Sequence, residues 1–370
     1  MVGIAREQTN VPLAPLTTLH LGGVAARLVD AATEDDVAAV VADAASRGDP
    51  LFVLGGGSNV VVGDGGFAGV VLRMALRGIV ARPEGANVVV DVAAGEEWDA
   101  FVAWAAAQGW TGVECLSGIP GRVGATPIQN VGAYGQEVKD TIASVRVFDC
   151  VTNRFVSMTA DECAFGYRTS RFKNDDRFVV VNVRFVLRAG GADGRSVGSE
   201  SAPIRYAELA KALAVPEGQS APIARVRETV IALRRGKGMV VDPQDPESVS
   251  AGSFFVNPVL DAAEFAELVA RAQTVTGQRP PGFDAGEGRT KVAAAWLVER
   301  AGFPKGWALG PLAPVAVSRK HALALVHRGG GTTRDLLAAA RAIQTGVRAR
   351  FGVTLEPEPV FVGCSFASEP

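Results

Sequence analysis

Two stretches of the chain are rich in glycine and could bind a ligand through the backbone. The first, Gly55-Gly56-Gly57-Ser58-Asn59, follows a short apolar segment, and the second runs from Leu116 to Gly135. Glycine adopts positive φ without strain and lets backbone N–H groups approach an anion closely, which is how phosphate-binding loops are built. A strand-to-strand turn would use the same residues as the first stretch, so both interpretations of it stay open.

The second stretch is the more specific of the two. Its glycines recur among small and hydroxylated residues, and it carries the side-chain amides of Gln129 and Asn130. Backbone donors and two reorientable amides suit a large cofactor with a polar ring edge. The first stretch fits neither G-x-x-x-x-G-K-[ST] nor G-x-G-x-x-G, because position 60 is valine. This disfavours a P-loop nucleotidase and a Rossmann dehydrogenase.

The composition agrees with a globular protein whose extra glycines are concentrated. Of 370 residues 43 are glycine, roughly 12% against a typical ~7%, and 14 of these fall within 55–69 and 109–135. The hydrophobic share of 48% excludes a disordered chain, and the net charge of −2 excludes a general basic surface for nucleic acid. We find no leader and no membrane-spanning run, so we expect a cytoplasmic protein without membrane or nucleic-acid partners.

The cysteines and histidines do not predict a metal site. The cysteines at 115, 150, 163 and 364 show no Cys-x-x-Cys spacing, and the chain has only three histidines. No zinc set can be drawn from them, and reduced thiols fit best.

Periodicity predicts the elements that must position the two loops. Predicted helices lie at 35–46, 98–108, 225–235, 262–275, 291–301 and 333–351. Predicted strands lie at 51–54, 60–62, 70–72, 88–92, 145–148, 178–187, 253–256 and 322–326. Residues 189–202, rich in Gly and Ser, are expected to form an exposed loop, and 280–288 a Pro- and Gly-rich turn.

Five motifs together resemble one enzyme family. They are Leu54 to Asn59, Ser117 to Gly135, Phe165 to Lys173, Ala251 to Pro258 and Leu355 to Pro359. In this order, from about Leu16 to Gly363, the chain resembles the UDP-N-acetylenolpyruvoylglucosamine reductases, also called UDP-N-acetylmuramate dehydrogenases. The resemblance implies an α+β flavoprotein of three domains: 1–75 and 76–237 would form a PCMH-type FAD-binding fold, 238–358 would bind substrate, and the tail 359–370 would join the first domain.

The resemblance also implies the reaction and its cofactors. NADPH would reduce a non-covalent FAD, which would pass hydride to C3 of the enolpyruvyl ether of UDP-N-acetylglucosamine, giving UDP-N-acetylmuramate for peptidoglycan. Negative charge then develops at C2. Arg168 would bind the substrate carboxylate, Ser253 would protonate C2, and Glu358 would be the third catalytic residue, with Glu356 as an alternative to it. No His or Cys lies inside either glycine loop except Cys115 at an edge, which argues against a covalent flavin.

The binding residues are carried over position by position. The FAD-binding residues would be Leu54, Gly55, Gly56, Gly57, Ser58, Asn59, Ser117, Gly118, Pro120, Gly121, Gly124, Ala125, Gln129, Asn130, Gly132, Ala133 and Tyr134. The substrate-binding residues would be Tyr167, Tyr206, Lys237, Asn257, Lys291 and His321. Tyr206 indicates the subclass with an extra Tyr-bearing element. Phe283 departs from the family, some of whose members have a tyrosine there, so a hydroxyl contact is in doubt.

Two other functions stay open beside this one. An FAD-dependent oxidase or lactone dehydrogenase would explain the glycine loops but not the Gly-Ser-Phe-Phe, Tyr-Arg-x-Ser and Leu-Glu-Pro-Glu motifs. A nucleotide-sensing regulatory protein would not need to hold FAD. We expect the protein to act as a monomer.

Overall fold

The computed structural model describes residues 6–189 and 200–367, so ten residues of the predicted loop 189–202 lie outside the described part. The chain forms two compact units, each described by itself below. Unit 1 comprises Met1–Val11, Ala25–Gly57 and Ala68–Val240, and unit 2 comprises Pro12–Val24, Ser58–Phe67 and Val241–Pro370. This grouping has its main division near residue 240; the three-domain division 1–75, 76–237 and 238–358, with the tail 359–370, stays a prediction.

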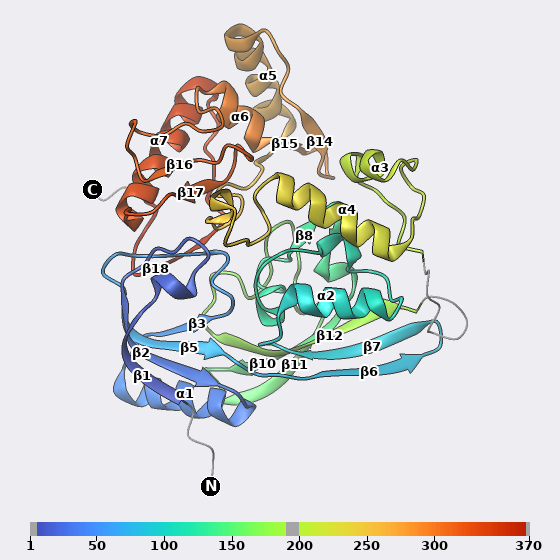
Figure 1. Ribbon diagram of the computed structural model, residues 1–370, viewed down its shortest axis with the longest axis vertical. Helices are drawn as coiled ribbons and strands as arrows, with labels where there is room; N and C mark the ends of the chain where they lie inside the picture. Colours follow the sequence, from blue (N-terminus) through green and yellow to red (C-terminus); the bar gives the residue numbers. More distant parts are fainter. Residues whose placement is uncertain (1–5, 190–199, 368–370) are drawn as a thin grey trace. The chain divides into compact units, whose positions relative to one another are not determined.

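Unit 1 is built on two sheets (Figure 1). The four-stranded sheet has the order β1 (Arg6–Pro12), β2 (Val24–Ala31), β5 (Phe67–Met74) and β3 (Leu51–Leu54), and the helix α1 (Glu34–Arg47) belongs to this part of the chain. The five-stranded antiparallel sheet has the order β11 (Arg154–Thr159), β10 (Ile142–Asp149), β12 (Phe178–Arg188), β7 (Asn87–Ala93) and β6 (Ile79–Glu84). A short hairpin pairs β8 (Gly132–Ala133) with β9 (Gln136–Glu137).

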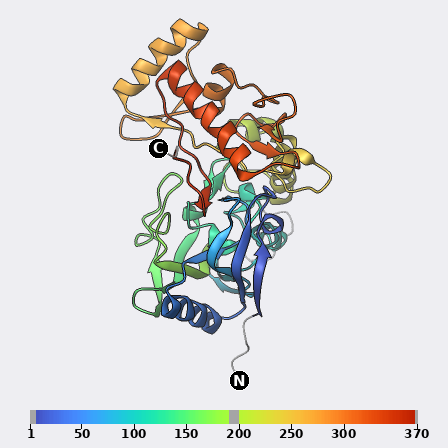
Figure 2. The same cartoon turned by 90° about the vertical axis from the view of Figure 1, so that its left-hand side faces the viewer.

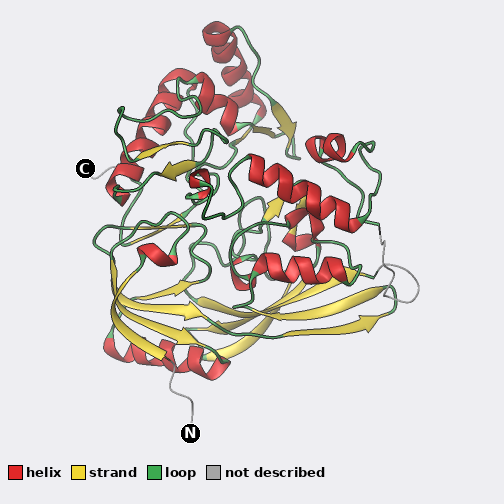
Figure 3. Cartoon of the chain, in the orientation of Figure 1, coloured by secondary structure: helices red, strands yellow, loops and turns green. Residues whose placement is uncertain are grey.

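Three helices of unit 1 lie near the second glycine stretch. They are α2 (Trp98–Ala107), α3 (Ala207–Leu213) and α4 (Ile223–Gly236). Trp98 and Phe101 of α2 are fully buried and pack on Phe185 of β12, with ring centroids 5.9 and 5.1 Å from its ring. Burying each aromatic side chain removes a large apolar area from water, which holds α2 on the sheet (Figure 3).

The described part of unit 2 has short sheets and three α-helices. The strands pair as β18 (Val360–Val362) with β4 (Val60–Val62) in parallel, as β13 (Val259–Leu260), β15 (Thr290–Val292) and β14 (Gly282–Asp284), and as β16 (Val315–Val317) with β17 (Leu325–His327). The helices are α5 (Ala262–Thr276), α6 (Ala294–Arg300) and α7 (Thr333–Phe351). Helix α7 contacts α5 and α6 (Figure 2). The apolar core of this unit includes Phe254, Phe255 and Phe351.

Local sequence explains where the long helices begin and end. Thr332 and Asp335 form a capping box at the start of α7, and Gly352, at φ 76°, ends it. The same box is formed by Thr33 and Asp36 at α1. Side-chain oxygens satisfy N–H groups that the first turn leaves unpaired, and glycine accepts the left-handed conformation after the last turn. Most predicted helices and strands are confirmed within one to three residues.

Three predictions for unit 2 are wrong in detail. Residues 253–256 form no strand; Ser253 bridges Ala324 whereas Phe255 bridges Pro357, so no continuous ladder develops. Lys291 lies on β15 and not on a helix, because α6 begins only at Ala294. The predicted turn 280–288 contains β14, which pairs with β15. In each case pairing with a distant segment overrides the local pattern.

Candidate functional site

The two glycine stretches meet inside unit 1. The first follows the buried end of β3, and Gly57 has φ 63°. A Cβ placed on Gly56 would lie 2.6 Å from Cα of Gly121, and one on Gly55 would lie 3.5 Å from Cβ of Ala125. Real Cβ atoms do not approach a backbone so closely, so glycine at position 56 is required by the crossing of the two loops. Leu54 is buried directly before this crossing.

The second stretch is held by neighbouring backbone and charge. Gly118, at φ 71°, donates its N–H to the carboxylate of Asp99 (2.6 Å), which Arg227 grips with two bonds of 2.7 and 2.9 Å. Ser117 is buried and donates its hydroxyl to the carbonyl of Glu114. The loop therefore has a fixed path, and its backbone is positioned by residues that lie outside it.

A buried positive charge lies behind this loop. The guanidinium of Arg234 is buried; its Nη2 donates to the carbonyl of Met239 (2.8 Å), and its Nε has no hydrogen-bond partner among the described residues. Burial lowers the pKa of Arg234 to about 10. A Cβ on Gly118 would lie 3.6 Å from Cδ of this arginine. A cationic environment and a glycine cradle fit the anionic diphosphate of a dinucleotide such as FAD.

Asn130 is used inside the protein. It is fully buried; its Nδ2 donates to the carbonyl of Gly166 and to Oε2 of Glu137, both at 2.9 Å, and its Oδ1 accepts the N–H of Lys139 (3.2 Å). The amide has two donors and both are occupied. This geometry suits a role of Asn130 in shaping the FAD-binding loop. It does not suit a hydrogen bond from the side-chain amide to the flavin.

Arg168 lies in a tight turn beside the same loop. Gly166 and Thr169 bridge across the turn, and Arg168 has φ 52°. Its Nη2 donates to the carbonyl of Gly132 (2.8 Å), and Lys173 donates its Nζ to the carbonyl of Arg168 (2.8 Å). The structure thus brings the predicted catalytic arginine to the predicted FAD loop, with the ring of Tyr167 5.6 Å from the guanidinium carbon.

Three of the predicted binding residues gather around Tyr134, near the end of the second glycine stretch. The rings of Tyr134 and Tyr206 pack edge to face with centroids 5.5 Å apart, and Nζ of Lys237 lies 5.5 Å from the Tyr134 ring. The same Nζ forms an ion pair with Glu208 at 2.6 Å. Burial raises the pKa of Tyr134 to about 12, so this hydroxyl is neutral at physiological pH. A lysine among aromatic rings suits a diphosphate or a nucleotide base.

Unit 2 holds Ser253, His321 and Glu358. The hydroxyl of Ser253 lies 3.2 Å from Nε2 of His321. The backbone N–H of Glu358 donates to the carbonyl of Phe254 (2.8 Å), which places the acidic segment beside Ser253. Glu358 is half-buried and Glu356 is exposed, which favours Glu358 of the two alternatives. Asn59 donates its Nδ2 to the carbonyl of Glu358 (3.4 Å), and Ser58 begins this segment of unit 2.

Asn257 and Lys291 lie on the β13–β15–β14 sheet or beside it. Asn257 accepts the N–H of Ala294 with its Oδ1 (2.9 Å) and so caps the start of α6. Lys291 pairs in register with Val259 on one side and with Phe283 on the other. Phe283 is 55% exposed. The departure at position 283 therefore lies directly beside the predicted substrate lysine.

Sequence reasoning missed the charged partners of the site. Asp99, Glu137, Lys173 and Glu208 hold predicted site residues, and none was singled out from the sequence. Lys173 is the last residue of the motif Phe165 to Lys173, and Glu137 lies two residues after the second glycine stretch, so the positions of both were a usable signal. Asp99 and Glu208 are paired with residues that are distant in the sequence, and nothing in the local pattern indicates those pairs.

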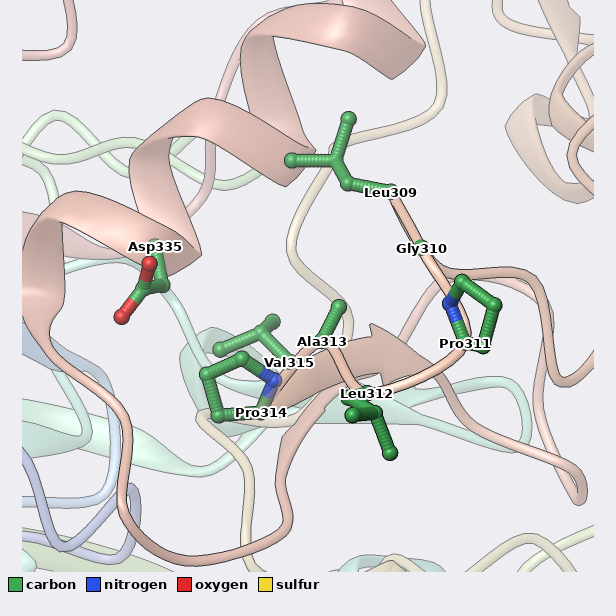
Figure 4. Close-up of a pocket in the computed structure, with 8 residues that line it drawn as sticks. All are labelled: Leu309, Gly310, Pro311, Leu312, Ala313, Pro314, Val315 and Asp335. Carbon is green, nitrogen blue, oxygen red and sulfur yellow. The ribbon is translucent and has the colours of Figure 1, made fainter.

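Other candidate centres carry no chemistry. A cavity of about 480 Å³ on unit 2 is lined by Leu309, Gly310, Pro311, Leu312, Ala313, Pro314, Val315 and Asp335 (Figure 4). Its one charged group, Asp335, is engaged in the cap of α7.

Within 6–189 and 200–367, no group of three His, Cys, Asp or Glu side chains could hold a metal ion, and no helix is long and apolar enough to cross a membrane. Burial raises the pKa of the Cys115 thiol.

Comparison with known proteins gives full-length similarity. The FAD binding domain family matches residues 25–155, and the family of the UDP-N-acetylenolpyruvoylglucosamine reductase C-terminal domain matches residues 244–362. The chain is 53% identical to the UDP-N-acetylenolpyruvoylglucosamine reductase of Thermobifida fusca over 357 residues, covering 96% of this chain and 97% of that protein. It is 52% identical to the Streptomyces avermitilis reductase over 361 residues, covering 97% and 95%.

A solved structure supports the fold. The crystal structure of UDP-N-acetylenolpyruvylglucosamine reductase from Thermus caldophilus matches with a TM-score of 0.62 at 24% identity, covering 97% of this chain and 98% of that one. The predicted α+β class with a PCMH-type FAD-binding fold is confirmed.

Proposed function

The chain belongs to the UDP-N-acetylenolpyruvoylglucosamine reductase family, and from this premise we propose how its own residues reduce the enolpyruvyl ether of UDP-N-acetylglucosamine in peptidoglycan precursor synthesis. The chemistry that bound FAD supplies is hydride transfer, with NADPH as the reductant and C3 of the enolpyruvyl group as the acceptor. The protein contributes binding, electrostatic stabilisation and a proton. The observation that carries the proposal is the contact of the Arg168 guanidinium with the carbonyl of Gly132 in the FAD loop.

Arg168 stabilises the charge that develops on the substrate. Hydride addition at C3 leaves negative charge at C2, which is conjugated with the substrate carboxylate. A guanidinium is permanently charged and offers a planar fork of donors to a carboxylate. Loss of one such donor commonly costs roughly 3–4 kcal/mol of transition-state stabilisation. The fixed turn that holds Arg168 supports this role, because a preorganised charge does not reorganise during the reaction.

Ser253 delivers the proton to C2. A serine hydroxyl is a weak acid, but the acceptor is a strongly basic carbon centre, and a positioned proton can contribute ~10²–10⁴-fold. His321, which the resemblance assigns to substrate binding, also lies at the Ser253 hydroxyl and can return a proton from Nε2 to Oγ after transfer. Glu358 is the third catalytic residue of the proposal, and its backbone contact with Phe254 supports its place beside Ser253.

The remaining residues bind. The backbone of the two glycine loops, from Leu54 to Asn59 and from Ser117 to Tyr134, holds FAD. Tyr167, Tyr206, Lys237, Asn257 and Lys291 hold the nucleotide, diphosphate or carboxylate of the substrate. We further propose that the protein is a cytoplasmic monomer without membrane or nucleic-acid partners. The net charge of −2 supports the absence of nucleic-acid partners.

One assay tests the function. The purified protein should show visible flavin absorbance and oxidise NADPH much faster when UDP-N-acetylenolpyruvoylglucosamine is present. Equal NADPH consumption without the sugar nucleotide would contradict the proposed reaction. The Ser253→Ala variant separates the steps: its flavin should still be reduced by NADPH, whereas reoxidation by the sugar nucleotide should slow by ~10²–10⁴-fold. An unchanged reoxidation rate would remove Ser253 from its role.

A further inference from the structure

The backbone of Arg168 is held in an unfavourable conformation. A non-glycine residue at φ 52° is uncommon, and such strain, of order 1–3 kcal/mol, persists only where the surroundings impose it. Here the surroundings are the second glycine stretch. The Arg168 Nη2 donates to the carbonyl of Gly132, its Nη1 lies 3.5 Å from the carbonyl of Asn130, and Ser170 donates its hydroxyl to the carbonyl of Ile128 (2.7 Å). The arginine turn and the loop are therefore joined at several points.

Asn130 is the residue through which the turn and the loop are coupled. Its side chain donates one N–H to the carbonyl of Gly166, at the base of the arginine turn, and its backbone carbonyl faces the guanidinium. Asn130 itself has φ 47° and is fully buried. The conformation of Asn130 therefore fixes the position of Gly166, where the arginine turn begins, and the direction of its own backbone carbonyl, which faces the Arg168 guanidinium.

Glu137 in turn fixes Asn130. Oε2 of Glu137 accepts the second N–H of the Asn130 amide (2.9 Å) and forms an ion pair with Nζ of Lys139 (2.8 Å). Glu137 also pairs in register with Gly132 across the β8–β9 hairpin. A Cβ on Gly132 would lie 2.8 Å from Cγ of Glu137 and 3.2 Å from Nη1 of Arg168, so both side chains approach the same point beside the Gly132 backbone, and a side chain at position 132 would meet both of them.

We propose that Glu137 is a positioning residue for Arg168, acting through Asn130 and Gly132. This inference rests on the proposed function of Arg168. Without an acceptor at this point, Nδ2 of Asn130 keeps only its bond to the carbonyl of Gly166, and the carbonyls of residues 130 and 132 lose the support that directs them at the guanidinium. Displacement of a reacting or stabilising group by about 1 Å can cost on the order of 10²-fold in rate.

Two substitutions separate the length of the side chain from its charge. Glu137→Gln keeps an oxygen within reach of Asn130 and removes the charge, whereas Glu137→Asp keeps the charge and withdraws the oxygen. The holoenzyme of each is followed by stopped flow in two half-reactions, flavin reduction by NADPH and flavin reoxidation by UDP-N-acetylenolpyruvoylglucosamine. We expect Glu137→Asp to reoxidise ~10- to 100-fold more slowly and Glu137→Gln to stay within about fivefold of wild type, the weight of a partly exposed ion pair.

A positioning role for Glu137 predicts that only one of the two half-reactions, flavin reoxidation by the sugar nucleotide, slows down. Flavin reduction should be unaffected in both variants, and Lys139→Ala should match Glu137→Gln, because it removes the same ion pair. The proposal is overturned if Glu137→Asp reoxidises like wild type, if Glu137→Gln is as slow as Glu137→Asp, or if both half-reactions slow together. A wild-type flavin that the sugar nucleotide fails to reoxidise would instead refute the proposed function, so the two failures are distinguishable.

Discussion

The hydroxyl of Ser253 lies 3.2 Å from the imidazole Nε2 of His321, although 68 positions separate the two residues in the sequence. The contact is fixed by the backbone: Ser253 bridges Ala324, and the N–H of Phe254 donates to the carbonyl of Leu323 (2.7 Å). Two segments that meet through main-chain bonds therefore carry the hydroxyl and the imidazole to one place. This geometry supports the proposal that the two residues act together to hold and replace the proton delivered to C2.

A double-mutant cycle tests whether Ser253 and His321 act together. His321→Ala should slow flavin reoxidation by the sugar nucleotide by ~10-fold or more, since the serine loses its hydrogen-bond partner. Adding His321→Ala to Ser253→Ala should have little further effect, because residues that act as a unit are not additive. The measurement is the stopped-flow rate of reoxidation in the four proteins at saturating substrate.

His321→Gln is the matched control for that cycle. Glutamine can still reach the hydroxyl with an amide but does not carry an ionisable proton. Partial recovery would assign His321 a holding role, and no recovery would assign it a proton-transfer role. Additive losses of rate in the double variant would show that Ser253 and His321 act independently, and would contradict the proposal that they act together.

The ion pair between Lys237 and Glu208 predicts a competition with substrate. Nζ of Lys237 is 2.6 Å from Glu208 in the structure. If Lys237 holds the substrate diphosphate, Glu208 must give up part of this contact on binding. Glu208→Gln should therefore lower the KM for the sugar nucleotide by about two- to fivefold, the range for a partly exposed ion pair, with kcat unchanged.

Glu228→Gln provides the control for this change. Glu228 is exposed on α4 and its substitution alters the net charge by the same amount. A KM that falls equally in both variants would indicate a general charge effect and would remove the specific competition. A raised KM in Glu208→Gln alone would indicate that Glu208 holds Lys237 in the binding pose.

Sequence reasoning succeeded where the structure is determined locally. Helix α7 was predicted at its observed bounds, because Thr332, Asp335 and Gly352 lie next to the turns they cap. The local pattern predicts a helix at Lys291, whereas the residue lies on a strand, because that strand exists only through its pairing with Val259 and Phe283.

The site shows the same limit. The motifs indicate Arg168, Ser253 and the glycine loops, because each of these lies within a continuous stretch of sequence that resembles the family. Glu137 bonds Asn130 only seven residues away, so its position beside the second glycine stretch was a usable signal. Asp99 acts through Arg227, 128 residues away, and a single sequence does not record such a pair.

The crossing of the glycine loops predicts a steric effect at Gly56. A methyl group there would lie 2.6 Å from Cα of Gly121, a backbone atom that cannot move without shifting the second loop. Gly56→Ala should cost about 1–3 kcal/mol of folding stability and should lower the flavin content of the purified protein, measured as visible absorbance per mole of chain. Gly65→Ala is the control, because nothing lies within 4 Å of that added carbon. Equal flavin content in the two variants would show that the crossing tolerates a side chain.

Asp99 predicts how flavin retention depends on pH. Burial alone would raise the pKa of Asp99, but the hydrogen bonds from Arg227 and from the Gly118 N–H outweigh burial, and the pKa lies below its ordinary value. A carboxyl group with a lowered pKa in the folded state stabilises that state above its unfolded pKa, and this stabilisation is lost as the pH falls through the folded pKa. The second loop should therefore loosen in acid, and flavin should be released there.

Asp99→Asn removes this titration. At neutral pH the variant should hold FAD more weakly, because Arg227 loses its charged partner and Gly118 keeps at best a neutral acceptor. Below the folded pKa it should differ less from wild type, because the wild-type carboxyl is then protonated too. The measurement is the fluorescence of released flavin across an acid titration.

Asp91→Asn is the control. Burial alone would raise the pKa of Asp91, but hydrogen bonds from Arg184 and Arg82 outweigh burial and lower it. This carboxylate lies on β7 and does not bond the second loop. Identical release curves for both variants would assign the acid sensitivity to global unfolding instead of to the Asp99 contact.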